Sequence, residues 1–359
     1  MTDKSLRLLK QIQEEVNKLL VDYFDRELKS KQSQKGLAGV AIKNIRRFIL
    51  SGGKRVRPAV MYYAYLASGG KKRRAALKAS LSIELIHSFL LMHDDIIDKD
   101  DKRHGISTIH KHYEKIGKRY FADKDIQHFG RSMAIIVGDL TYSFGNKILF
   151  SADFKPEVIV KAMNKLQDIV YDVIDGEMLD VQLGFRGQAT EKEIIRVQKA
   201  KTAYYTFDGP IALGQILAES NDKKMAENFT KYSLALGRAF QIRDDILGIF
   251  GDEKKLGKPV GSDITEGKRT LLTNYIVRYG SPKEKKIMND LLGRDKITTR
   301  ELKLFQNIMR ESGSLEYSQQ KVRELTQEAV DILDEINFQS AKSKEFFRGI
   351  AEYLAKRDK

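Results

Sequence analysis

Five aspartates fall within eight positions, from Asp94 to Asp101, directly after the apolar run 89–92. If residues 81–98 form one helix, Asp94 and Asp98 project from the same face, because side chains four positions apart lie one above the other. Like charges at this spacing repel unless a cation or water separates them. Magnesium takes one or two carboxylates and fills its remaining positions with water and phosphate oxygens. The motif therefore indicates a magnesium site for a phosphorylated ligand, and a helix end that simply faces water is the alternative.

A second acidic pair, Asp244 and Asp245, follows 150 residues later in similar apolar surroundings. We expect this pair on a second helix. Two such helices packed side by side would aim their carboxylates into one cavity, which could hold magnesium together with a ligand rich in negative oxygens.

Basic residues recur beside both acidic motifs. The glycine-bearing stretch 52–58 contains Lys54, Arg55 and Arg57. Its backbone donors and guanidinium groups could hold a phosphate. The stretch lacks the Walker pattern of a nucleotide-binding loop, and a solvated surface loop is the alternative. Lys102 and Arg103 follow the first acidic motif, and Lys258 and Lys268 flank the glycine-rich stretch after the second. Lys201 is expected in the middle of a helix, just before Thr202.

The elements that must position these residues are expected to be helices. Only five prolines interrupt 359 residues, and alternating strand patterns are scarce. From residue 314 onward, apolar residues recur at spacings of three and four, which predicts an amphipathic helix. Its stripe consists of Val322, Leu325, Ala329, Leu333 and Ile336.

Helix starts and loops complete the expected organisation. The pairs Thr190/Glu193 and Thr298/Glu301 predict capping boxes. We expect loops at 51–57, 68–74, 184–189 and 251–267, none with the length or composition of a domain linker. The chain is therefore interpreted as one domain, residues 1–359, with an N-terminal helical segment at 1–35.

Composition sets limits on partners and compartment. Basic residues outnumber acidic ones by 64 to 49, which suits nucleic acid, anionic lipid or a phosphorylated small molecule. Basic patches interleaved with aromatic residues are not evident, so no nucleic-acid partner is expected. Cysteine is absent, which excludes disulfides and thiolate metal sites. Without a signal peptide or an apolar run of about 18 residues, we expect a cytoplasmic protein with at most weak membrane-surface contact.

Seven motifs in one order resemble the trans-type, head-to-tail isoprenyl diphosphate synthases, from about Lys35 to the C-terminus. They are GGKRVRP at 52–58, ELIHSFLLMHDDIID at 84–98, RHG at 103–105, GD at 138–139, the Lys-Thr pair at 201–202, FQIRDDILG at 240–248 and GKPVGSDITEGKR at 257–269. The pattern is most similar to the archaeal type of geranylgeranyl diphosphate synthase. The resemblance implies the all-α isoprenoid synthase fold, a single-domain antiparallel helical bundle around a deep central cavity. It also implies a homodimer and acidic motifs that face one another near the mouth of the cavity.

The resemblance further implies a role for each matching residue. The magnesium ligands, for several ions in one site, would be Asp94, Asp95, Asp98, Asp244 and Asp245, with Asp94 and Asp98 as the principal ligands in the first motif. The contacts to the allylic diphosphate would be Arg103, Lys201, Lys258 and Lys268. The isopentenyl diphosphate site would comprise Lys54, Arg57, His87 and His104. The catalytic residues near the developing cation would be Lys201, Thr202 and Gln241.

Three positions depart from the family pattern. Gly248 stands where many members have a third aspartate in the second motif. His104 replaces the second arginine of the usual Arg-Arg-Gly, which leaves a titratable donor in place of a permanent charge. Glu177 stands where glutamine is commoner, and no role is assigned to it.

The expected reaction is magnesium-assisted ionisation of an allylic diphosphate, condensation with isopentenyl diphosphate and loss of a proton. By resemblance, Phe89 beside the non-aromatic Leu90, with no insertion in the first motif, implies a geranylgeranyl product. Phe89 as ordinary core packing is the alternative. His93 is interpreted as structural rather than as a base.

Other functions are weighed against this reaction. A related synthase would give a farnesyl or geranylfarnesyl product. A class I terpene cyclase would show a second metal motif that is not apparent here. A non-catalytic synthase subunit would commonly lack the first aspartate motif, which is intact. The allylic primer and the effect of His104 are left open by the sequence.

Overall fold

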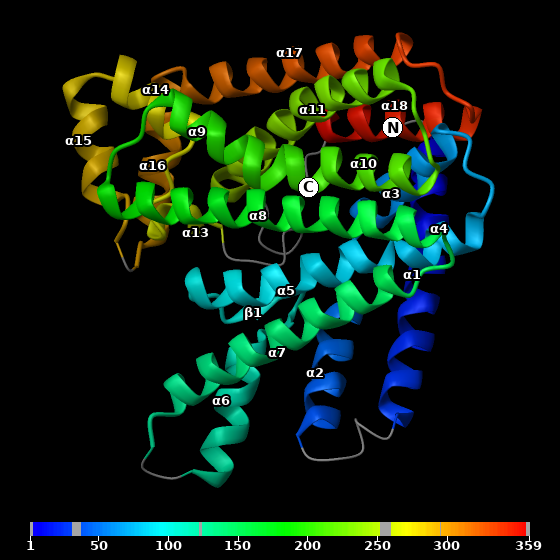
Figure 1. Ribbon diagram of the computed structural model, residues 1–359. Coiled ribbons are helices and arrows are strands. Elements are labelled where there is room, and N and C mark those ends of the chain that lie inside the picture. The colour runs from blue at the N-terminus through cyan, green and yellow to red at the C-terminus, as the bar shows by residue number, and fades with distance from the viewer. Residues whose placement is uncertain (1–2, 31–36, 122–123, 252–259, 295, 357–359) are drawn as a thin grey trace. The chain divides into compact units, whose positions relative to one another are not determined.

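The computed structural model describes residues 3–30, 37–121, 124–251, 260–294 and 296–356 (Figure 1). Within these ranges nearly all regular structure is helical, and the strands form one two-stranded hairpin. The chain groups into two compact units. The N-terminal unit comprises residues 6–166 and 213–220, and the C-terminal unit comprises 167–212, the residues from 221 onward and the start of the chain. The single-domain interpretation stays a prediction.

The N-terminal unit is built around α5, which packs along α7, while α6 forms an antiparallel pair with α7 (Figure 1). Its elements are α1 (Asp3–Lys29), α2 (Ala38–Leu50), α3 (Val56–Ala67), α4 (Arg73–Ala79), α5 (Leu81–Ile97), β1 (Lys102–Arg103), β2 (Ile106–Ser107), α6 (Ile109–Tyr120) and α7 (Ile126–Phe150). Helix α5 is apolar on most of its circumference, and Ile83, Leu85, Ile86 and Met92 are fully buried. A helix buried on several sides is rigid, which suits an element that carries a site.

The hairpin β1–β2 pairs Arg103 with Ile106 in antiparallel register. Its two turn residues, His104 and Gly105, have φ of 49° and 77°. Positive φ at both central residues is the signature of the tight turn that matches strand twist, and histidine is one of the side chains that tolerate it.

The C-terminal unit centres on α11, which packs against η1 and α17 (Figure 1). Its elements are α9 (Glu191–Val197), the π-helix η1 (Gln198–Asp208), α11 (Lys223–Phe250), α13 (Ser262–Thr265), α14 (Leu271–Tyr279), α15 (Pro282–Leu291), α16 (Thr299–Glu311), α17 (Ser314–Asp334) and α18 (Ala341–Lys356). Two helices, α8 (Pro156–Arg186) and α10 (Gly209–Leu217), contribute residues to both units. Buried side chains of α11, α13, α14, α15, α16 and α17 form its core cluster.

Most of the expected elements are found. Four of the five members of the predicted stripe, Val322, Leu325, Ala329 and Leu333, are buried on α17. The fifth, Ile336, is buried just beyond the end of this helix. Both predicted capping boxes form, at Thr190 and at Thr298. The expected loops at 51–57, 68–74 and 184–189 are shorter in the structure, because α3, α4 and α8 extend into them. The expected loop at 251–267 contains α13.

One described segment, Arg73–Ile97, has the length and composition of a membrane-spanning helix. Within it, 72% of the most apolar window is buried inside the protein. A core helix of a globular protein passes the same test, so this segment is weak evidence for a membrane span.

Candidate active site

The first acidic motif lies at the end of α5. Asp94 and Asp98 are both half-buried, and the backbone amide of Asp98 donates to the carbonyl of Asp94 (2.8 Å). The helix then ends, because Lys99 has a φ of 58°. Since the last turn is intact up to Asp98, the two carboxylates rise from the same helix face, as the sequence predicts.

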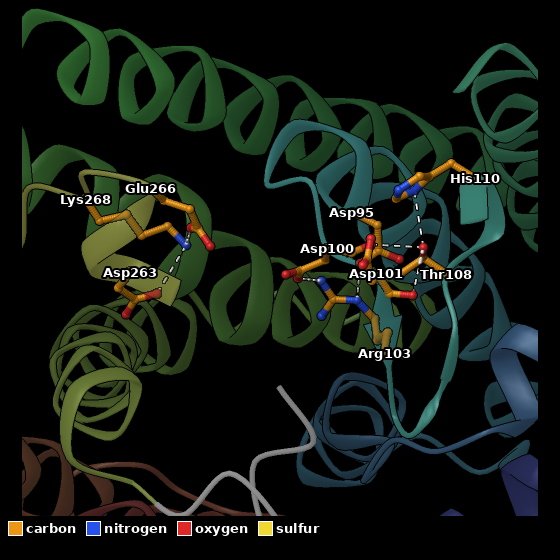
Figure 2. Close-up of polar contacts among 9 residues, drawn as sticks. All are labelled: Asp95, Asp100, Asp101, Arg103, Thr108, His110, Asp263, Glu266 and Lys268. Carbon is orange, nitrogen blue, oxygen red and sulfur yellow. Dashed lines mark hydrogen bonds and ion pairs between the residues drawn. The ribbon is translucent and has the colours of Figure 1, made fainter. Parts of the chain in front are cut away.

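Asp95 points elsewhere and is fully buried. Its carboxylate lies 2.5 Å from Nε of Arg103, whose Nη2 lies 3.4 Å from Asp100 (Figure 2). Burial raises the pKa of Asp95 to about 7, against the opposing charge of Arg103. The pair ties the hairpin to α5, so Asp95 positions Arg103 beside the motif.

The hairpin is also fixed at its far end. The Thr108 hydroxyl lies 3.0 Å from the carbonyl oxygen of Asp100, 3.5 Å from that of Asp101 and 3.2 Å from Nδ1 of His110 (Figure 2). Thr108 thereby holds the start of α6 against the end of the acidic motif.

The basic stretch 52–58 separates into residues with different surroundings. Arg55 has a φ of 54° and is buried. Its guanidinium lies 2.5 Å from Glu84 and also donates to Asn17 and to the Ile49 carbonyl. Arg55 therefore holds the loop in place. Lys54 is exposed and Arg57, in the first turn of α3, is half-buried, so these two predicted phosphate contacts are accessible.

Both histidines of the expected isopentenyl diphosphate site lie among these arginines. Burial lowers the pKa of His87 well below its usual value, and the charges of Arg57 and Arg103 lower it further. Burial and Arg103 also lower the pKa of His104. A Cβ at Gly52 would lie 2.7 Å from the His104 ring, so only glycine lets the loop approach the hairpin this closely. The structure thus brings the basic loop, α5 and the hairpin together.

Phe89 lies on α5 about 7.5 Å before Asp94 along the helix axis. Its side chain is 8% exposed, and its ring packs on Tyr142 of α7 at a centroid distance of 5.3 Å. Leu90 is half-buried and, four residues before Asp94, lies on the same helix face as that carboxylate.

His93 links α5 to α7. Its Nε2 lies 3.2 Å from the Ile135 carbonyl oxygen and 3.9 Å from Asp139, and its ring meets Phe89 edge-on at 4.9 Å. These contacts agree with the structural role expected from the sequence.

In the C-terminal unit, the lysine-threonine pair lies in η1. π-Helical turns are rare and frequently occur at functional sites. The Lys201 ammonium lies 2.6 Å from Glu177 and 2.7 Å from Asp180, both on α8. These carboxylates fix the direction in which the cation points.

A chain of hydrogen bonds connects η1 to the second acidic motif on α11. The Thr202 hydroxyl donates to Oε1 of Gln241 (2.5 Å), and Nε2 of Gln241 donates to Asp245 (2.8 Å). Asp244, beside it, is half-buried. Burial and the nearby charge of Asp263 raise the pKa of Asp245 to about 8. The three residues therefore form one network with a fixed amide orientation.

Gly248 explains how Asp263 reaches this network. A Cβ at position 248 would lie 2.1 Å from Oδ2 of Asp263, so the carboxylate of Asp263 occupies the space beside the glycine. The second acidic motif lacks a third aspartate on α11, and Asp263 of α13 places a carboxylate there instead.

Lys268 lies next to the same carboxylate. Its Nζ is 2.6 Å from Glu266 and 3.5 Å from Asp263 (Figure 2). Lys258, which was predicted together with Lys268 to bind the allylic diphosphate, lies outside the described residues.

The carboxylates of each acidic motif suit magnesium. Asp94 and Asp98 on α5, and Asp244 on α11, offer half-buried carboxylate oxygens, which are the hard ligands that magnesium prefers. Among the described residues, no three His, Asp or Glu side chains gather closely enough to hold an ion alone. Magnesium needs only one or two carboxylates when phosphate oxygens complete its shell, so the residues fit the ion.

Sequence reasoning missed three residues that the structure places beside predicted site residues or motifs. Glu177 and Asp180 hold Lys201, and Asp263 lies beside Gly248. The spacing of three between Glu177 and Asp180 on a helix is a signal that both face one cation. Asp263 carries no local signal of its role.

Comparison with known proteins places the chain in a family. Residues 40–309 match the family model for polyprenyl synthetase. The chain is 33% identical over 311 residues to the geranylgeranyl diphosphate synthase of Saccharolobus solfataricus, covering 86% of this chain and 88% of that protein. It is 29% identical over 348 residues to the geranylfarnesyl diphosphate synthase of Aeropyrum pernix, covering 95% of this chain and 100% of that protein.

Among solved structures, geranylgeranyl pyrophosphate synthase from Corynebacterium glutamicum, complexed with isoprenyl diphosphate and magnesium, matches with a TM-score of 0.91. The identity is 30%, over 97% of this chain and 99% of that chain. The chain therefore belongs to the polyprenyl synthetase family. This membership confirms the predicted all-α isoprenoid synthase fold and the predicted class of enzyme, a trans-prenyltransferase.

Proposed function

We propose that this prenyltransferase condenses isopentenyl diphosphate with an allylic diphosphate and releases geranylgeranyl diphosphate as its main product. The observation that carries the choice of product is the arrangement of α5. Phe89 is buried against Tyr142 about 7.5 Å before Asp94, with Leu90 on the Asp94 face. A hydrocarbon growing from a diphosphate held at Asp94 would meet these side chains after a limited number of additions.

Asp94, Asp98 and Asp244 are the residues proposed to hold magnesium. When bound, the ion supplies Lewis-acid stabilisation of the diphosphate leaving group. Lys201, Lys268 and Arg103 bind the same diphosphate, each presented by the carboxylates that hold it. A donor fixed in place before the reaction is worth roughly 3–4 kcal/mol of transition-state stabilisation.

Thr202 and Gln241 are proposed to stabilise the allylic cation. Their hydroxyl and amide oxygens lie in the network that ends at Asp245, so their dipoles do not need to reorient during the reaction. Lys54, Arg57, His87 and His104 hold isopentenyl diphosphate. No side chain is required as a nucleophile, because the isopentenyl double bond attacks the cation.

Product sizing tests the proposal. Purified protein is incubated with magnesium, isopentenyl diphosphate and dimethylallyl, geranyl or farnesyl diphosphate, and product length is measured for wild type, Phe89→Ala and Leu90→Ala. We expect a twenty-carbon product from wild type and a longer one from Phe89→Ala. Unchanged product length in both variants would show that Phe89 and Leu90 are ordinary core residues. If no primer is elongated, the proposed reaction is refuted.

A geranylfarnesyl product is the second candidate, because the Aeropyrum pernix relative bears that name. The same assay separates the two, since the wild-type protein would then release a twenty-five-carbon diphosphate.

We further propose a cytoplasmic homodimer. Tyr171, Ile174, Met178 and Phe185 lie at helical spacing on α8 and are 73%, 40%, 61% and 92% exposed. An apolar stripe of this kind is typical of a surface that a second copy covers. Analytical ultracentrifugation of wild type and Met178→Glu tests it, because a charge in the stripe should shift a dimer towards monomer.

A further inference from the structure

A cavity of about 720 Å³ lies in the C-terminal unit. Its lining comes from the end of α8, the loop that follows, and helices α9, α14 and α15, whose backbones are drawn in Figure 1. We call it the α9–α14 pocket. It is lined by Arg186, Gly187, Gln188, Ala189, Thr190, Glu193, Ile194, Arg269, Thr273, Asn274, Val277 and Asn289. None of these residues has a role in the proposed reaction, and the volume is in the range of small-molecule sites.

Two residues of this lining each carry a buried donor that has no acceptor among the described residues. Asn274 is 7% exposed, and its Nδ2 has no hydrogen-bond partner among the described residues. The Nε of Arg269 is likewise buried without a hydrogen bond in the described part of the chain. Buried donors without partners are costly, and a ligand that drew these two side chains towards the cavity would supply both with an acceptor.

The charges of the lining leave a positive excess. The lining contains two arginines and one glutamate. The Glu193 carboxylate accepts hydrogen bonds from Arg186 (2.7 Å) and from the amide and hydroxyl of Thr190 (2.8 Å each). Its charge is therefore matched by Arg186, so among the described residues that line the pocket no carboxylate is left for Arg269.

Burial lowers the pKa of Arg269, and no acidic neighbour raises it. A guanidinium in this position is stabilised by an anion that accepts hydrogen bonds from two of its N–H groups. Phosphate oxygens can accept from these N–H groups and from a side-chain amide. The apolar side chains of Ile194 and Val277, with Ala189, supply contact area for the rest of a ligand larger than phosphate itself.

We infer that the α9–α14 pocket binds a phosphorylated small molecule at a site separate from the aspartate-rich motifs, with Arg269 and Asn274 as the phosphate contacts. The inference does not depend on the proposed prenyl-transfer reaction.

Titration calorimetry on the full chain without divalent ions tests the inference, with inorganic diphosphate and geranyl diphosphate as probes. The variants are Arg269→Gln, Asn274→Leu and Asn289→Asp. Loss of a charge-assisted hydrogen bond should raise Kd for the probes by about tenfold in Arg269→Gln. Asn289 is exposed, so Asn289→Asp adds a negative charge to the lining without disturbing the core.

The matched controls make the same charge changes elsewhere. Arg323→Gln on α17 and Asn307→Asp on α16 alter exposed residues outside the pocket. Both variants should bind the probes with the wild-type Kd. Thermal unfolding of every variant shows whether it is folded. Weaker binding of geranyl diphosphate than of inorganic diphosphate would identify the free anion as the better ligand, and the reverse would identify the ester. Either result supports the pocket if the pocket variants weaken the binding.

Prenyl-transfer kinetics separate this pocket from the active site. We expect Asn274→Leu to weaken probe binding while KM for both substrates stays unchanged. If KM rises in parallel with Kd, the probe was bound at the active site and the inference is overturned. Equal titrations of the pocket variants and their controls would overturn it as well. If no prenyl transfer is found in any protein, the proposed function fails and the binding comparison still decides the pocket.

Discussion

His104 is a turn residue whose charge depends on pH. Burial and the charge of Arg103, with a further contribution from Arg55, lower its pKa, while Glu84 opposes the shift. The imidazole is therefore neutral at pH 7. A bound diphosphate would favour the protonated form, so this group contributes charge to binding only as pH falls through the pKa of the complex. Burial also lowers the pKa of His87 well below its usual value.

We expect His104→Arg to lower KM for isopentenyl diphosphate at pH 7 by roughly threefold to tenfold, because a permanent charge strengthens the hydrogen bond to phosphate. In wild type, KM should fall as pH decreases from about 8 to about 6, and this dependence should flatten in the variant. Steady-state kinetics across this range measure both effects. His128→Arg makes the same change at an exposed position of α7 and should leave KM unaltered. A KM that does not respond to His104→Arg would remove this residue from the substrate site.

The acidic residues show which features of the candidate site can be predicted from the sequence and which cannot. Asp94 and Asp98 can be paired from their spacing, because a helix fixes which side chains share a face. Asp263 cannot, because its position beside Gly248 depends on how α13 packs against α11. The sequence shows a missing carboxylate at position 248, and the structure shows a carboxylate in that space. Likewise, Arg55 and Arg57 look equivalent in the sequence, and only burial against Glu84 separates their roles.

At the scale of elements, the sequence predicts those features that depend on residues close together in the chain. The capping boxes and the stripe of α17 depend on residues within one or two turns, so the sequence predicts them directly. The hairpin β1–β2 has two residues in each strand, which is too short for alternation to be visible. The sequence predicts only a helix around Lys201, and the structure shows that this stretch is the π-helix η1, which packs against α11.

The capping box at Thr298 supports α16, which contributes the buried side chains of Phe305, Ile308 and Met309. We expect Thr298→Ala to lower the free energy of unfolding by about 1 kcal/mol, because the amide of Glu301 loses its acceptor. Hydrogen bonds from the Thr298 backbone and hydroxyl lower the pKa of Glu301. The ionised cap therefore stabilises the fold above the unfolded pKa and is lost as pH falls through the folded one.

Urea denaturation at pH 7 and at about pH 3 measures this effect, and the loss caused by Thr298→Ala should be smaller at the lower pH. Thr299→Ala is the matched control, since it removes the same side chain one position later, where no cap forms. Equal losses for both variants would contradict a specific role of the box.

At the scale of the whole molecule, the two acidic motifs belong to different compact units, α5 to one and α11 to the other. The family match spans residues of both units. The proposed chemistry requires the motifs to act on one diphosphate, and this requirement can be tested by kinetics alone.

We expect Asp94→Asn and Asp244→Asn each to lower kcat by about 10²–10³, the usual loss for an electrostatic group in a transition state. Residues that act on the same group as a unit are strongly non-additive, so the double variant should be little slower than the worse single variant. Asp290→Asn, an exposed change on α15, should keep wild-type kcat and combine additively with either. Single-turnover measurements at saturating magnesium give the required rate constants. If the losses from Asp94→Asn and Asp244→Asn multiply in the double variant, the two carboxylates act independently, and a shared magnesium-diphosphate site would be excluded.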